Sequence, residues 1–119
     1  MNTIGKNEEL LNYMSLEKLY LIDSALDRID IFEEQFAPVI ELYFKLSRNN
    51  NMLKIRFSSV LEYGFYYKDN HSFYNVERCK FFKNEDLFYI SLDPYDEEKS
   101  MEQNDQDFIL CREIQGYML

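Results

Sequence analysis

The sequence contains little glycine or proline and no tryptophan. Gly5, Gly64 and Gly116 are its only glycines, and it has two prolines. Ten asparagines, three of them consecutive, are therefore expected to form many of the turns, because Asn and Asp tolerate left-handed backbone and bond to it locally. Three scattered glycines also exclude a glycine-rich phosphate-binding loop.

Histidine and cysteine, the residues that most often perform chemistry, are equally scarce. Cys79 and Cys111 lie 32 positions apart, with no CxxC spacing and no histidine beside them. We expect two free thiols in a reducing cytosol, with a disulfide between them as the alternative. His71 is the one histidine, and it lies in a predicted loop without a nucleophile elbow or a cysteine at catalytic spacing. The sequence therefore predicts no catalytic residue, no metal site, no cofactor and no enzymatic activity.

Long apolar runs and excess basic residues are also absent. No run approaches the ~20 apolar residues that a membrane helix needs. Residues 1–11 are polar and acidic and lack the apolar core of a secretory signal, so we expect a cytoplasmic protein. Acids outnumber bases 22 to 13, for a formal net charge of −9. Binding to nucleic acid or to an anionic membrane is therefore not expected, because both need clustered Lys and Arg. A basic partner is the electrostatic match.

Apolar residues, in contrast, are plentiful. They make up 46% of the 119 residues, and ten Tyr and ten Phe bring the aromatic share to 17%. A chain of this length buries roughly two-thirds of the surface that it exposes when unfolded. We therefore expect one domain over residues 1–119 that needs neither a metal nor a disulfide to fold.

Alternation of apolar and polar residues gives the clearest structural signal. Residues 40–46 and 53–58 both alternate, and residues 47–51 between them are turn formers, which predicts a β-hairpin. One face is apolar. The other face carries side chains that we expect to meet water: Tyr43, Lys45, Lys54 and Arg56.

Further strands are predicted where aromatic or alternating apolar residues gather: 62–68, 88–92 and 108–119. Residues 69–72 and 83–86 are predicted turns. The segment 73–83 fits either a strand or a helix, and we favour the strand. Residues 7–14 predict a short helix that Asn7 caps, with acids at the positive end of its dipole.

Residues 18–23 and 27–33 are predicted to be extended, although their apolar spacing also suits a helix. Taken together, the pattern predicts a mainly β fold at the margin of α+β. We expect an antiparallel sheet, sandwich or partial barrel of about seven strands with a short N-terminal helix.

Acidic residues concentrate in the acidic loop, residues 93–107, which holds seven carboxylates against one lysine. Calcium binding is one interpretation, but the loop lacks the EF-hand spacing and its glycine. A solvated loop without a partner is another. We expect a negative surface for a basic partner, with Tyr95 as an exposed aromatic anchor. The predicted partner-binding residues are Asp93, Tyr95, Asp96, Glu97, Glu98, Glu102, Asp105 and Asp107.

Residues 88–96, Phe-Tyr-Ile-Ser-Leu-Asp-Pro-Tyr-Asp, precede an acidic spacer and then residues 105–109, Asp-Gln-Asp-Phe-Ile. This arrangement resembles small acidic immunity proteins of bacterial polymorphic toxin systems. Residues 53–57, Leu-Lys-Ile-Arg-Phe, and the aromatic strand after them are also similar, so the resemblance spans 18–119. It implies a cytoplasmic, non-enzymatic protein that neutralises one cognate toxin by direct binding, and it has no catalytic residues to carry over.

Two other classes remain open at this stage. The second hypothesis is an acidic nucleic-acid mimic or another small adaptor. The third is an enzyme with an unrecognised site around His71. A homodimer is also compatible with the sequence, since an exposed edge strand can pair two copies.

Overall fold

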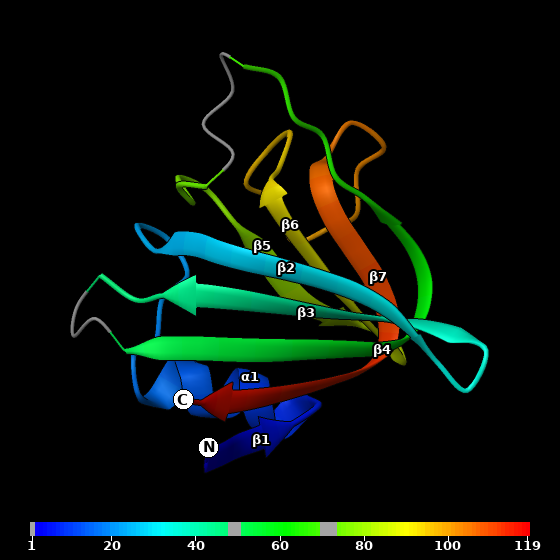
Figure 1. The fold of residues 1–119 in the computed structure, drawn as a ribbon. Coiled ribbons are helices and arrows are strands. Elements are labelled where there is room, and N and C mark those ends of the chain that lie inside the picture. Colours follow the sequence, from blue (N-terminus) through cyan, green and yellow to red (C-terminus); the bar gives the residue numbers. More distant parts are fainter. Residues whose placement is uncertain (1, 48–50, 70–73) are drawn as a thin grey trace.

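The computed structural model describes residues 2–47, 51–69 and 74–119, and one antiparallel sheet dominates it (Figure 1). The elements in chain order are β1 (Asn2–Lys6), α1 (Glu8–Leu16), β2 (Ala25–Glu34), β3 (Ala37–Lys45), β4 (Met52–Gly64), β5 (Lys80–Asn84), β6 (Leu87–Asp93) and β7 (Gln106–Met118). The strand order is β2-β3-β4-β7-β6-β5, and β1 pairs with β7 outside this path. Over the described residues, the predicted mainly β fold with one short helix is confirmed.

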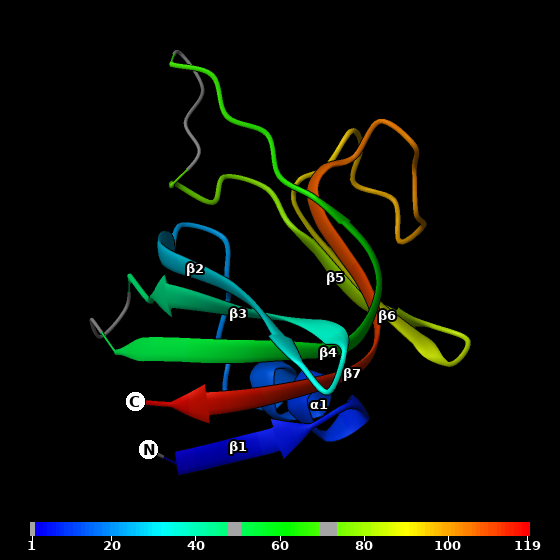
Figure 2. The ribbon, with the colours of Figure 1, turned by 45° about the vertical axis from the view of Figure 1, so that its right-hand side comes forward.

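Strand β7 organises the sheet because both of its edges are paired. Strand β4 runs along one edge, from Gly64 opposite Phe108 to Leu53 opposite Met118. The other edge is shared, since β6 pairs with residues 106–111 and β1 with residues 115–118. In Figures 1 and 2, β5 and β6 cross the direction of β2, β3 and β4 instead of continuing in their plane. The sheet therefore folds over on itself.

The two ends of the strand order approach each other at the start of β2. Ala25 forms an isolated antiparallel bridge with Asn75, and the N–H of Leu26 donates to the carbonyl of Tyr74 at 2.7 Å. Residues 74–76 form a short strap that leads on to β5. This contact partly closes the sheet, as expected of a partial barrel.

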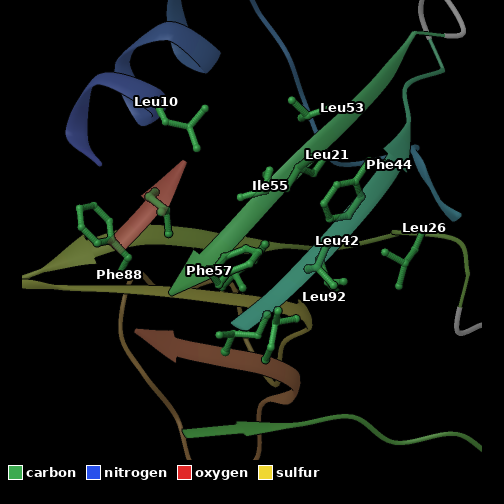
Figure 3. Packing of buried hydrophobic residues seen from close by; sticks show 14 of the residues in the cluster. Leu10, Leu21, Leu26, Leu42, Phe44, Leu53, Ile55, Phe57, Phe88 and Leu92 are labelled. Carbon is green, nitrogen blue, oxygen red and sulfur yellow. The ribbon is translucent and has the colours of Figure 1, made fainter. Parts of the chain in front are cut away.

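The core lies on the concave side of the folded sheet (Figure 3). Three pairs of almost completely buried residues lie directly opposite each other across β3 and β4: Ile40–Phe57, Leu42–Ile55 and Phe44–Leu53. Leu10 and Met14 of helix α1 are buried against the same cluster. The predicted hairpin is therefore confirmed in its two strands, while residues 48–50 of its turn lie outside the described residues.

The opposite face of this hairpin is less open to water than the alternation predicts. The Glu41 side chain is only 10% exposed, and it pairs with Arg56 at 3.1 Å and Lys54 at 3.5 Å. Arg56 also donates two 2.7 Å hydrogen bonds, one to each carboxylate oxygen of Glu34 on β2. Charges of opposite sign on three neighbouring strands thus make a network that covers the face.

The prediction that residues 18–23 are extended is wrong, because left-handed residues interrupt the segment. Lys18 has φ 54° and Asp23 has φ 70°. Leu21 is nevertheless buried in the core, and Ser24 donates a side-chain hydrogen bond to its carbonyl. The apolar residues of this segment therefore line the core from an irregular chain.

Two predicted strands are shorter in the structure. Within 62–68, only residues 62–64 are extended, as the end of β4. In the segment 73–83, the strand begins at Lys80, and no helix occurs among its described residues, 74–83. Residues 88–92 and 108–118 are strands as predicted. The predicted turn at 69–72 lies largely outside the described residues.

The N-terminal helix is confirmed, although its predicted cap is wrong. Asn7 occupies the N-cap position but makes no side-chain capping hydrogen bond. Its backbone N–H donates to the carbonyl of Ile114 and its side-chain oxygen accepts from the N–H of Ile114, so it ties the helix to β7. Strand β1 was not predicted. No helix in the described part of the chain is long and apolar enough to cross a membrane.

Candidate functional site

The acidic loop connects β6 to β7 and is held in place from inside. Asp93 ends β6, and Gln106 and Asp107 begin β7, so the irregular part comprises residues 94–105. The carboxylate of Asp105 is completely buried and accepts hydrogen bonds from the hydroxyl of Tyr89 and the backbone N–H of Tyr95, both at 2.7 Å. It also accepts from the N–H of Glu102 at 3.1 Å. One side chain therefore fixes both ends of the loop.

Lys80 of β5 supplies the positive charge for this cluster. Its side chain is only 3% exposed. The ammonium contacts both carboxylate oxygens of Asp105, at 3.1 and 3.2 Å, and it bonds Asp96 at 2.7 Å and the carbonyl of Ser100 at 2.9 Å. A buried ion pair is stable only when further hydrogen bonds satisfy its atoms. Here the backbone of the loop supplies them, so the charged pair and the loop conformation depend on each other.

The pKa directions follow from these contacts. Burial alone would raise the pKa of Asp105, but the hydrogen bonds from Tyr95, Tyr89 and Lys80 outweigh it and hold that pKa below its ordinary value. The hydrogen bond from Lys80 lowers the pKa of Asp96. Burial would lower the pKa of Lys80, but its bonds to Asp96 and Asp105 raise it. All three groups are therefore charged at neutral pH.

The predicted binding residues separate into an exposed and a buried set. Tyr95 is 62% exposed, which confirms the predicted exposure of its ring, and Glu97 and Glu98 are also exposed. Asp93, Asp96 and Glu102 are half-buried. Asp105 and Asp107 are buried. We therefore assign these last two residues to shaping the loop, and the exposed set to any contact made by it.

Asp107 performs a second structural task. Its φ is 50°, and its carboxylate accepts a 2.8 Å hydrogen bond from the N–H of Tyr66, which follows β4. This bond joins the start of β7 to the segment after β4. The side chain is therefore directed into the protein and away from the surface of the loop.

A hollow of about 360 Å³ lies beside the acidic loop, and no sequence pattern pointed to it. The rings of Tyr89 and Phe108 stack in its wall, with centroids 6.1 Å apart. The carboxylates of Glu62 and Glu102 and the side chain of Met101 also line it. Tyr89 is buried, so the partly exposed ring of Phe108 and the two carboxylates are the groups that suit a cationic side chain.

The residues considered for chemistry give no competing site. Cys79 and Cys111 are both free thiols, as expected, and burial raises the pKa of each to about 12. Such thiols are poor nucleophiles at neutral pH. His71 lies outside the described residues. Within them, no group of three or more His, Cys, Asp or Glu side chains is arranged to hold a metal ion.

No protein-family model, curated protein or solved structure matches this chain.

Proposed function

We propose that this chain is an immunity protein that neutralises a cognate bacterial toxin by binding it through the acidic loop. One observation carries the proposal: the buried Lys80–Asp105 pair fixes a loop whose Tyr95, Glu97 and Glu98 side chains are exposed. A loop that is ordered before binding loses little conformational entropy when the complex forms. The exposed set is therefore prepared for contact.

The charge of the molecule supports a basic partner. The net charge is −9, and the acidic loop holds seven of the 22 acids. Complementary charge accelerates association and favours the correct partner over others. A nuclease toxin carries basic residues to hold its substrate, so it has the required sign. Tyr95 adds a large aromatic surface at the centre of these charges, as binding hot spots often do.

The hollow beside the loop supports the same proposal. A lysine or arginine of the partner would enter this hollow beside the partly exposed ring of Phe108 and approach the carboxylates of Glu62 and Glu102.

Co-expression with the product of the adjacent upstream gene tests the function. That product should be toxic alone and harmless together with this chain, and the two should co-purify. A neighbour that is not toxic alone, or whose toxicity this chain does not relieve, contradicts the proposal.

Charge reversal tests the surface. We expect Glu97→Lys with Glu98→Lys to slow association strongly, and Tyr95→Ala to weaken binding by roughly thirtyfold, or about 2 kcal/mol. Glu85→Lys with Asp86→Lys in the β5–β6 turn changes the net charge equally at another exposed site and serves as the control. Surface plasmon resonance against the purified toxin measures the association rate and the affinity of each variant. Equal losses in both double variants would show that only overall charge matters.

Competition with DNA separates an immunity protein from a nucleic-acid mimic. A mimic occupies the DNA site of its target, and its binding decreases steeply with salt. A complex that includes a packed Tyr95 should retain most of its affinity at high salt.

A further inference from the structure

The outer edge of β2 over residues 27–34, here called the β2 edge, has no strand beside it in the described chain. Strand β2 pairs with β3 on its other side. The strap at 74–76 reaches only its first two residues, through Ala25 and Leu26. An unpaired edge presents a row of N–H and C=O groups that can bind another strand.

The β2 edge carries two features that discourage such pairing, five charged residues and a register irregularity between Leu26 and Arg28, but it lacks others. Natural edge strands are commonly short, or carry Lys or Pro. Strand β2 is ten residues long and contains neither. Strand β5 at the other end of the order has five residues, of which Lys80 and Lys83 are two. Ile31 and Phe32 on β2 are 45% and 37% exposed. By its length and its lack of Lys and Pro, β2 is thus the less protected of the two edges.

The tip of this hairpin presents a second unusual feature. Gln35 and Phe36 form a two-residue turn with φ 53° and 65°, and the Phe36 side chain is 96% exposed. Turns with two positive φ values favour Asn-Gly, because a large side chain is strained there. The fold gains no packing from Phe36 in return.

Geometry restricts how two copies can join through this edge. An antiparallel pair of identical strands has its two-fold axis perpendicular to the sheet, so only residues of the same face lie opposite each other. With Asp30 on the axis, Asp30 faces its own copy and Asp27 faces Glu33. With Phe32 on the axis, Asp30 of one copy instead lies opposite Glu34 of the other. Both arrangements place like charges directly opposite, which destabilises a sheet.

One register over residues 28–34 avoids this conflict, and it has Ile31 on the axis. Arg28 then lies opposite Glu34 of the second copy, and this pair occurs twice. Their side chains are 64% and 54% exposed, so both remain accessible despite contacts within their own chain. Ile31, half-exposed at the end of the core face, lies opposite Ile31 of the second copy. Moving the axis further towards the start of β2 would place residues 32–34 of one copy opposite residues 24–26 of the other. The strap is already bonded to residues 24 and 26.

We propose that two copies of this chain associate by antiparallel pairing of their β2 edges, with Ile31 opposite Ile31. In this dimer, Glu34 of each copy lies opposite Arg28 of the other, and the turn that carries Phe36 follows directly after the paired residues. The pairing ends where each strap begins. Seven residues from each copy form a small interface, which makes the dimer a weak one, in the micromolar to millimolar range. The proposal does not depend on the immunity function.

Sedimentation equilibrium of the whole chain tests the dimer. We expect Ile31→Lys, which puts two like charges on the axis, to weaken self-association at least tenfold. Leu61→Lys is the matched control, because Leu61 is 47% exposed on β4, which β3 separates from β2. A wild-type chain that remains monomeric at about 1 mM overturns the proposal. Equal weakening by both variants, or by neither, also overturns it.

Cross-linking tests the register. Ile31→Cys should be joined rapidly between copies by a short bismaleimide, because a residue on the axis meets itself across the pair. Leu61→Cys should react no faster than the wild-type chain, whose Cys79 and Cys111 set the background. Failure of Ile31→Cys to exceed that background in a sample that dimerises shows that another surface pairs, which overturns the proposal.

Discussion

At the scale of single residues, Lys80 and Asp105 carry opposite charges into a region that solvent hardly reaches. Removing charges from water is costly, and their mutual attraction offsets the cost only where other atoms also bond them. Four groups donate to Asp105: the Lys80 ammonium, the Tyr89 hydroxyl and the N–H groups of Tyr95 and Glu102. Loss of the carboxylate would therefore disturb the whole loop at once.

We expect Asp105→Asn to destabilise the protein by about 3 kcal/mol, because it leaves the Lys80 charge buried with less compensation. Asp96→Asn removes a Lys80 partner that is 34% exposed, so its cost should be about 1 kcal/mol. Urea denaturation followed by tyrosine fluorescence measures both. Equal costs for the two variants would contradict a central role for Asp105.

The same contacts predict how stability depends on pH. The pKa values of Asp105 and Asp96 are lower in the folded protein than in the unfolded chain. Their stabilisation is thus complete above an unfolded pKa of about 3.9 and is lost as pH decreases through the folded values. The pKa of Lys80 is raised, so its contribution disappears only in strong alkali. Stability measured from pH 7 to pH 2 should decrease below about pH 4, and it should decrease less steeply in the double variant Asp96→Asn with Asp105→Asn.

Sequence patterns locate the acidic loop but do not reveal which of its acids are buried. Tyr95 was predicted to be exposed and is exposed. Asp105 and Asp107 resembled their acidic neighbours and proved to be interior. What distinguishes Asp105 is Lys80, which lies 25 positions earlier on another strand and reaches the loop only through the β5–β6–β7 pairing. The composition of the loop alone therefore cannot predict the contact between Lys80 and Asp105.

At the scale of elements, the tight turn between β2 and β3 is a strained connection. Glu34 pairs directly with Ala37, so Gln35 and Phe36 alone reverse the chain. Replacing Phe36 by Gly should stabilise the monomer by about 1 kcal/mol, because glycine adopts positive φ without steric cost. Thermal unfolding at low concentration, where no dimer forms, measures this gain. Gln35→Asn should also be stabilising while it keeps the ring.

These two turn variants also separate the strain in the turn from self-association. Both turn residues lie outside the paired residues 28–34, so Phe36→Gly and Gln35→Asn should each raise the melting temperature without weakening self-association. A Phe36→Gly variant that is less stable than wild type would contradict the strain assigned to this turn.

Elements were predictable where one face alone is buried. The hairpin over 40–58 shows period two clearly, because each strand has a core side and an outer side. The segment 18–23 has no such regularity, since left-handed Lys18 and Asp23 let its apolar residues reach the core from an irregular path. Strand β1 forms by pairing with the free edge of β7. Gly5 allows β1 to lie close to the backbone of Leu10, because a side chain at this position would collide with it. Five residues contain too little pattern to reveal that arrangement.

At the scale of the whole molecule, the two proposed surfaces should respond to salt in opposite directions. Each copy carries a net charge of −9, so two copies repel at long range and salt should strengthen the β2–β2 dimer by screening that repulsion. Association with a basic toxin is steered by attraction, so salt should slow it. The partner complex and the dimer are therefore distinguishable in a single salt titration.

The pairing of β1 with β7 determines the order in which the strands can pair during synthesis. Asn2 lies opposite Met118, and β7 also supplies the partner edge for β4 and for β6. The strand that holds this sheet together is thus the last of its strands to leave the ribosome, and β1 must wait for it. Until then β4 and β6 lack a common neighbour, and their apolar faces stay open to other chains. Nascent protein should consequently depend on chaperones until β7 emerges, and this domain should reach its native state only afterwards.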